Sequence, residues 1–107
     1  MKISVVTVCF NSKKFIEFTF ESILNQSYKN IEYIVIDGGS TDGTLNVIKR
    51  YEKLFNQKGI SLIWTSEKDK GMYDALNKGF KRATGDIFCW INSDDFLMPW
   101  TFSVVAK

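Results

Sequence analysis

The stretch "MYDALNKGFKRATGDIFCWIN", residues 72–92, decides the fold class because it joins a helical pattern to a strand pattern. After residue 84, Gly85 stops the helix, and "DIFCWIN" (86–92) is typical of a buried strand. A helix that leads into an apolar strand is the repeating unit of a parallel α/β sheet. The apolar and small residues at helical spacing are Met72, Ala75, Leu76, Gly79, Phe80 and Ala83.

The same alternation runs through the rest of the chain. Three further strands are predicted at "KISVVTVCF" (2–10), "IEYIVID" (31–37) and "ISLIWT" (60–65). The resulting order, β-α-β-α-β-α-β, predicts one α/β domain over residues 1–107 with an open, mainly parallel, Rossmann-like sheet.

The helices between these strands have recognisable starts and apolar faces. We expect Ser12 to cap the first helix, Ser40 or Thr41 to cap the second, and Pro99 to open a short last helix. The predicted core positions are Phe15, Thr19, Phe20, Ile23 and Leu24 in the first helix, and Leu45, Ile48, Tyr51, Glu52 and Phe55 in the second.

The composition excludes several functional classes. The net charge of +2 over 107 residues is too small to indicate nucleic-acid binding. The absence of histidine excludes His-based triads and His-ligated zinc, so a metal would need oxygen ligands, which favours Mg²⁺ or Mn²⁺. The two cysteines, Cys9 and Cys89, lie in apolar runs and are expected to be reduced thiols. "MKISVVTVCF" reads as a strand and not as a signal or membrane segment, which makes a cytoplasmic location the expectation.

Polar residues collect where the predicted strands end. In an open parallel sheet ligands bind outside the carboxyl ends of the strands. Asn11 follows the first strand, Asp37 ends the second, "EKDK" (67–70) follows the third, and "SDD" (93–95) follows the fourth. Three of these four ends are acidic and share one rim. No G-x-G-x-x-G follows the first strand and no G-x-x-x-x-G-K-[ST] occurs, so neither a dinucleotide site nor a P-loop is indicated.

The adjacent carboxylates of Asp94 and Asp95 have two readings. In an extended backbone their side chains would point to opposite sides, so one could reach a divalent cation and the other a sugar hydroxyl. Alternatively, Asp95 could act as an N-cap for the last helix near Pro99. Residue patterns leave both readings open.

Taken together, the motifs resemble the N-terminal half of family 2 glycosyltransferases, inverting enzymes with a GT-A fold. The resemblance rests on "ISVVTVCFN", "VIDGGSTDGT" and "SEKDKGMYDALNKGFKRATGDIFCWINSDD", and covers essentially the whole chain. The form "DKGMYDALNKG" is similar to that of bacterial transferases that build surface polysaccharide. The family resemblance implies a truncated nucleotide-diphospho-sugar-binding domain that lacks the acceptor-binding part.

The resemblance also implies roles for individual residues. Asp37 corresponds to an acid that bonds the nucleotide base, usually uracil, and Asp94 to a residue that meets the ribose or sugar. Asn92 stands where the family often has Asp, so the metal ligand is either Asp95, which we favour here, or Asp94. The other donor-binding positions are Thr7, Cys9, Asn11, Lys70, Asn77 and Ser93.

The implied reaction is transfer of a hexosyl group, with inversion, from a nucleotide sugar to the hydroxyl of a saccharide or lipid-linked saccharide acceptor. Mn²⁺ or Mg²⁺ would serve as cofactor. The family's catalytic base lies beyond Lys107, so the 107-residue chain is expected to be inactive alone. A longer protein could associate peripherally with the inner face of the membrane.

The rival hypotheses are a non-catalytic nucleotide-sugar-binding or assembly module and, with less support, a nucleotidyltransferase. Uncovered apolar surface predicts self-association.

Overall fold

The computed structural model describes residues 1–68 and 70–106, and the acid expected at the rim at position 69 lies outside them. The sheet has four parallel strands in the order β3-β2-β1-β4, which confirms the predicted α/β class. The elements are β1 (Ile3–Cys9), α1 (Lys13–Leu24), β2 (Ile31–Asp37), α2 (Thr44–Gln57), β3 (Ser61–Ser66), α3 (Met72–Arg82), β4 (Ile87–Trp90) and α4 (Thr101–Val105).

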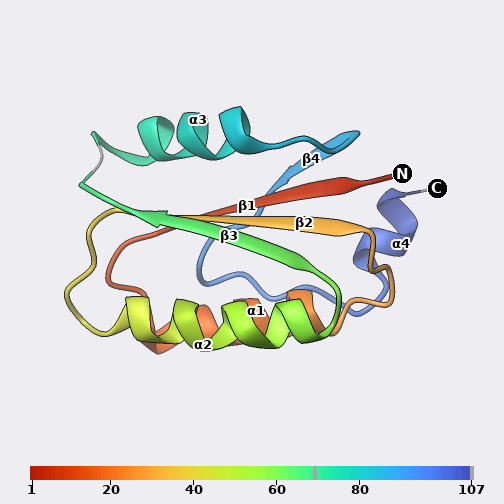
Figure 1. Cartoon of the computed structure of the whole chain (residues 1–107), viewed down its shortest axis with the longest axis horizontal. Helices are drawn as coiled ribbons and strands as arrows, with labels where there is room; N and C mark the ends of the chain where they lie inside the picture. The colour runs from red at the N-terminus through yellow and green to blue at the C-terminus, as the bar shows by residue number, and fades with distance from the viewer. Residues whose placement is uncertain (69, 107) are drawn as a thin grey trace.

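The sheet lies between two helical layers. Helices α1 and α2 cover one face and α3 covers the other, while α4 lies near both termini, at the end where the strands begin (Figure 1). Alternate side chains of β1 enter different layers, as the two-residue period of a strand requires. Val5 packs with Tyr33 in the cluster between the sheet and helices α1 and α2, whereas Val6 packs with Ala75 in the cluster between the sheet and α3.

A glycine permits the close approach of α3 to the sheet. A Cβ built on Gly79 would lie 2.4 Å from Cγ1 of Val6 and 3.4 Å from Cγ1 of Ile36. Both neighbours are buried strand residues with branched side chains, so neither can move aside easily. The sequence pattern placed Gly79 on the buried face, and the structure shows that this face requires the smallest residue.

Three details of the helices differ from the sequence-based expectations. Phe15 is 50% exposed, and Ile16 occupies the core position instead. Ser12 precedes α1 but makes no side-chain capping bond. Helix α2 begins after Gly43, not after Ser40 or Thr41. The left-handed φ of 100° at Gly43 turns the chain there, and Asp42 Oδ1 accepts the N–H of Thr44 at 3.0 Å.

The chain after β4 also departs from the prediction. Strand β4 ends at Trp90, earlier than the predicted Asn92. Pro99 lies in a turn before α4, which begins at Thr101. The reason for the early end is local: Asn92 to Asp95 forms a turn of its own, which leaves the extended path of the sheet.

Candidate functional site

A cavity of about 680 Å³ opens at the carboxyl ends of β1 and β4. Its walls come from the end of β1, the start of α1, the start of α3 and the turn after β4. Phe10 and Phe15 are 61% and 50% exposed, so both present aromatic surface to solvent. The lining residues are Val8, Cys9, Phe10, Asn11, Ser12, Phe15, Gly71, Ala75, Asn92, Ser93 and Asp94.

Asn11 shapes the wall that follows β1. Its φ of 49° is left-handed, a conformation that Asn tolerates better than most residues. Its N–H donates to Ser40 Oγ at 2.8 Å, and its Oδ1 accepts the N–H of Thr41 at the same distance. These two bonds join the loop after β1 to the loop after β2, so the cavity wall is held by both.

Asp37 lies beneath this wall and is fully buried. Its Oδ2 accepts the N–H of Gly39 at 3.0 Å and the N–H of Ser40 at 2.8 Å. Oδ2 also accepts Ser66 Oγ at 2.8 Å, and Oδ1 accepts Cys9 Sγ at 3.3 Å. The carboxylate therefore ties the ends of β1, β2 and β3 together, and a base could reach it only by displacing these donors.

The same contacts decide the charge of Asp37. Burial alone would raise its pKa, but hydrogen bonds from Ser40, Ser66 and Cys9 stabilise the ionised form. Their combined effect holds the pKa of Asp37 below its ordinary value. A carboxylate that is ionised at neutral pH is thus a structural part of the rim.

The acidic pair after β4 lies in a tight turn and not in extended backbone. The N–H of Asp95 donates to the carbonyl of Asn92 at 3.1 Å, and Asp95 Oδ2 accepts the N–H of Asn92 at 2.9 Å. The expectation of an extended backbone was therefore wrong, although the two carboxylates still face different surroundings. The cap reading was also wrong, because α4 follows Trp100 and has no side-chain cap.

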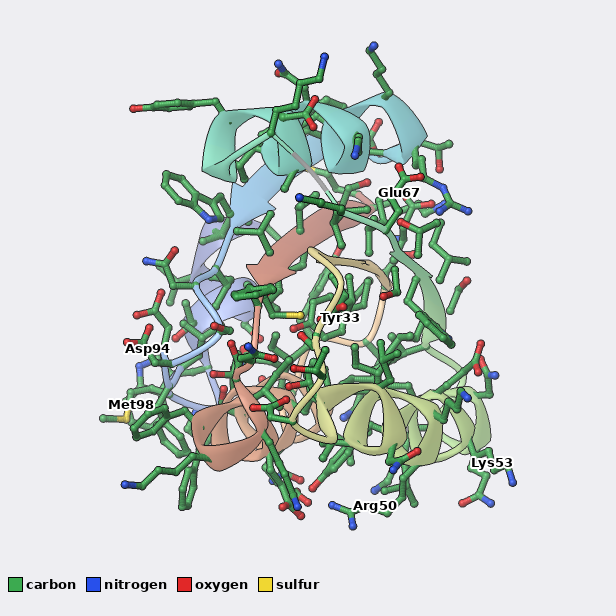
Figure 2. All side chains as sticks on the ribbon, turned by 90° about the vertical axis from the view of Figure 1, so that its left-hand side faces the viewer. Tyr33, Arg50, Lys53, Glu67, Asp94 and Met98 are labelled. Carbon is green, nitrogen blue, oxygen red and sulfur yellow. The ribbon has the colours of Figure 1, made fainter. Side chains whose placement is uncertain are left out.

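In this turn the carboxylates of Asp94 and Asp95 have different surroundings. Asp94 is exposed and lines the cavity beside Asn92 and Ser93, whereas the side chain of Asp95 closes the turn. Ser93 Oγ shares a hydrogen bond of 3.0 Å with Ser12 Oγ, so the turn is also joined to the start of α1. Figure 2 views the carboxyl ends of the strands and shows Asp94 and Glu67 on opposite sides of this rim.

The structure brings only some of the predicted residues to the cavity. Cys9, Asn11, Ser93 and Asp94 line it. Thr7 is buried, and its hydroxyl shares a hydrogen bond of 2.7 Å with Tyr33, which lies between the sheet and the α1–α2 layer (Figure 2). Both cysteines are thiols, as expected.

The predicted residues at and beyond the loop after β3 lie outside the cavity lining. Lys70 is exposed, and its N–H donates to Asp74 Oδ2 at 3.0 Å. Asn77 is an exposed residue of α3. Glu67 pairs with Lys78 at 3.0 Å, so its carboxylate is engaged along α3.

Several lining residues were missed from the sequence. The sequence pattern places Phe15 and Ala75 on the apolar faces of their helices, and Gly71 in the loop after the third strand, without a role in binding for any of them. The available signal was their position: the N-terminus of α3 follows the end of β3, at the rim where ligands bind in such sheets.

The cavity offers oxygen donors for a hard cation. Within the described residues, no three His, Cys, Asp or Glu side chains form a group that could hold a metal. Asp94, with the Asn92 amide and Ser93 hydroxyl beside it, is a donor set suited to Mg²⁺ or Mn²⁺ that also binds phosphate oxygens. The residues present thus fit a divalent metal that is coordinated both by the protein and by the phosphate oxygens of a bound ligand.

The sequence pattern of the family described as "Glycosyl transferase family 2" matches residues 4–107. The chain belongs to this family. The match covers nearly all of the sheet and the cavity described above, and it confirms the resemblance drawn from the motifs.

Two curated relatives are glycosyltransferases. The chain is 44% identical over 88 residues to dolichyl N-acetyl-alpha-D-glucosaminyl phosphate 3-beta-D-2,3-diacetamido-2,3-dideoxy-beta-D-glucuronosyltransferase of Methanococcus voltae, covering 80% of this chain and 27% of the relative. It is 37% identical over 93 residues to the putative teichuronic acid biosynthesis glycosyltransferase TuaG of Bacillus subtilis (strain 168), covering 87% and 36%. The chain therefore spans about a third of the length of these relatives.

Solved structures show the same fold. S. aureus TarS 1–349 in complex with UDP-GlcNAc matches with a TM-score of 0.86 and 28% identity, over 99% of this chain and 30% of TarS. The mannosyltransferase PcManGT from Pyrobaculum calidifontis, in complex with GDP-Man and Mn²⁺, matches with a TM-score of 0.81 and 28% identity, over 89% and 28%. The chain thus has the GT-A fold. No helix formed by residues 1–68 and 70–106 is long and apolar enough to cross a membrane.

Proposed function

We propose that this chain is the donor-binding part of an inverting glycosyltransferase that takes a nucleotide-diphospho-sugar, with a UDP-sugar as the first candidate. The observation that carries the proposal is the cavity at the strand ends, into which the turn after β4 presents Asp94. A TarS structure of the same fold holds UDP-GlcNAc. The teichuronic acid relative supports a proposed role in the synthesis of bacterial surface polysaccharide.

Within the cavity we assign the nucleoside to the wall formed by Val8, Cys9 and Phe10. This wall is largely apolar, and the exposed ring of Phe10 offers a face on which a base can stack. Asp37 supports the wall from below through its bonds to the loop after β2. We therefore propose that Asp37 orders the base site and does not itself contact the base.

We assign the diphosphate to the side of the cavity formed by Asn92, Ser93 and Asp94. Asp94 would be the protein ligand of a divalent metal, because it faces the cavity while Asp95 closes the turn. Mn²⁺ or Mg²⁺ supplies Lewis-acid stabilisation of the charge on the departing diphosphate when bound. Asn92 and Ser93 can donate to phosphate or ribose oxygens from the same turn.

Acceptor binding and deprotonation of the acceptor hydroxyl are assigned to the remainder of a longer protein. The relatives are about three times the length of the matched region, which leaves room for both. The chain alone is therefore proposed to bind a donor without transferring the sugar.

Thermal unfolding with nucleoside diphosphates tests this function. A ligand that binds only the folded chain stabilises it by about 2.7 kcal/mol at 100 times its Kd. UDP with Mn²⁺ should raise the Tm, and either component alone should raise it less. If UDP, GDP and TDP all leave the Tm of a folded sample unchanged in the presence of Mn²⁺, the proposal fails.

A further inference from the structure

Helix α1 and the residues just after it carry polar side chains that are almost completely buried. Thr19 and Gln26 have no exposed surface, and Ser22 has 3%. Buried polar groups are kept where they have hydrogen-bond partners. Thr19 in α1 and Gln26 just after it find their partners in the segment that follows β4, between residues 95 and 102.

The bonds from α1 reach both flanks of the acidic turn. Thr19 Oγ1 donates to the carbonyl of Asp95 at 2.6 Å, immediately after Asp94. On the other flank, the hydroxyls of Ser12 and Ser93 share a hydrogen bond of 3.0 Å. Ser93 and Asp95, the residues on either side of Asp94, are thereby bonded to α1 and to Ser12 just before it.

Gln26 fixes the same segment further along. Its Nε2 donates to the carbonyl of Met98 at 2.7 Å, and its Oε1 accepts the N–H of Phe102 at 3.0 Å. Phe102 is in the main core, so this end of the segment has a second anchor. Between Ser93 and Met98, the Thr19 bond is the one side-chain hydrogen bond that the described residues record from α1 to the backbone of this segment.

Asp94 itself is left open. Among the described residues, no hydrogen bond or ion pair to its carboxylate is recorded, although it lines the cavity. Its direction is therefore set by the turn backbone and not by a partner of its own. A small rotation of the peptide that follows it would move the carboxylate relative to a bound diphosphate.

We infer that Thr19 is a positioning residue: its buried hydroxyl holds the Asp95 carbonyl and so aims Asp94 at the metal on the donor diphosphate. This inference rests on the proposed function. Partners behind a metal ligand typically change metal affinity by about 10- to 100-fold when they are removed. Thr19 does not touch the Asp94 carboxylate but acts one step further away, through the backbone of the turn, so we expect an effect at the lower end of this range.

Three variants separate positioning from stability. Thr19→Val keeps the shape and removes the hydroxyl, and Thr19→Ser keeps the hydroxyl. Ser22→Ala is the matched control, because Ser22 is equally buried in α1 but its hydroxyl donates to Thr19 O within the helix at 2.8 Å. Mn²⁺ affinity is measured by electron paramagnetic resonance in the presence of UDP, at a temperature where every variant is folded.

Thr19→Val should weaken Mn²⁺ binding about tenfold, while Thr19→Ser and Ser22→Ala stay close to the parent. Equal affinity of Thr19→Val and the parent, or an equal loss in Ser22→Ala, would overturn the inference.

Amide hydrogen exchange provides a readout that needs no ligand. The N–H of Asp95 bonds to the Asn92 carbonyl, so Thr19→Val should reduce its protection while Ser22→Ala leaves it unchanged. Unchanged protection in Thr19→Val would overturn the inference even if the parent binds no Mn²⁺ with UDP. Failure of the parent to bind Mn²⁺ in the presence of UDP would instead contradict the proposed function.

Discussion

Asp95 Oδ2 accepts the backbone N–H of Asn92 at 2.9 Å, so the second carboxylate of the acidic pair closes the turn that carries the first. This relationship explains how two adjacent acids can be accommodated at the end of a strand. One is satisfied by the backbone, and the other, Asp94, remains directed at the cavity. The two residues should therefore respond differently to substitution.

Asp94→Asn should abolish most Mn²⁺-dependent binding of UDP and leave the Tm nearly unchanged, because Asp94 is exposed. Asp95→Ala should lower the free energy of unfolding by about 1 kcal/mol through loss of the turn bond, and should weaken Mn²⁺ binding only partly. Calorimetry and thermal unfolding measure both effects. Asp86→Asn, just before β4, is the charge-matched control. A larger loss of Mn²⁺ binding in Asp95→Ala than in Asp94→Asn would reverse our assignment.

Asp37 should make stability depend on pH. Its pKa is lower in the folded chain than in the unfolded chain, so the stabilisation it provides is fully present above the unfolded pKa of about 3.9. That stabilisation is lost as the pH falls through the lower folded pKa.

Asp37→Asn tests the pH dependence by urea unfolding at a series of pH values. The amide places an N–H₂ donor among the N–H and O–H donors around Asp37, so we expect a loss of about 2–3 kcal/mol at pH 7 and a flatter acid limb. Glu52→Gln on α2 controls for the loss of one negative charge. If the free energy of unfolding of Asp37→Asn falls at low pH as steeply as that of the parent, the Asp37 carboxylate is not the source of the pH dependence.

Gly79→Ala should destabilise the fold despite the higher helix propensity of Ala. The propensity gain is about 1 kcal/mol, whereas overpacking a buried contact costs about 1–3 kcal/mol. A Cβ 2.4 Å from Val6 Cγ1 places this site at the upper end of that range. Chemical denaturation should show a net loss relative to Lys81→Ala, an exposed substitution in the same helix. Equal stability of the two variants would mean that α3 can shift at no cost.

The apolar surface of β4 and the segment after it should promote self-association. Phe88, Trp90 and Trp100 are 53%, 43% and 60% exposed, and Met98 lies at the outer edge of the molecule in Figure 2. Light scattering at increasing concentration should show a rising average mass, which Trp90→Ser reduces. A constant monomer mass at high concentration would contradict this prediction.

Hydrophobic periodicity was enough to predict the element order and the parallel sheet. β2 matched its predicted range of residues 31–37, because a strand buried on both faces leaves a continuous apolar run. The helical face of α3 was also confirmed at Ala75 and Leu76. These features depend on local sequence, which is why pattern alone predicts them.

The cavity could be predicted only in outline, because it depends on contacts between distant segments. The bond between Ser12 and Ser93 joins residues 81 positions apart. The burial of Asp37 depends on donors from three strand ends, and no spacing in the sequence reveals them. Phe15 and Ile16 are adjacent apolar residues, and tertiary packing alone decided which of them entered the core.

The central claim is that the chain binds a nucleoside diphosphate with a divalent metal through Asp94. Isothermal titration of UDP into the parent chain and into Asp94→Asn, each with Mn²⁺ and with EDTA, tests it most directly. The account predicts that the parent binds UDP far more tightly with Mn²⁺ than with EDTA, and that Asp94→Asn loses this difference. Equal affinity of parent and variant in Mn²⁺, or no binding of UDP, GDP or TDP by the folded parent, would contradict it.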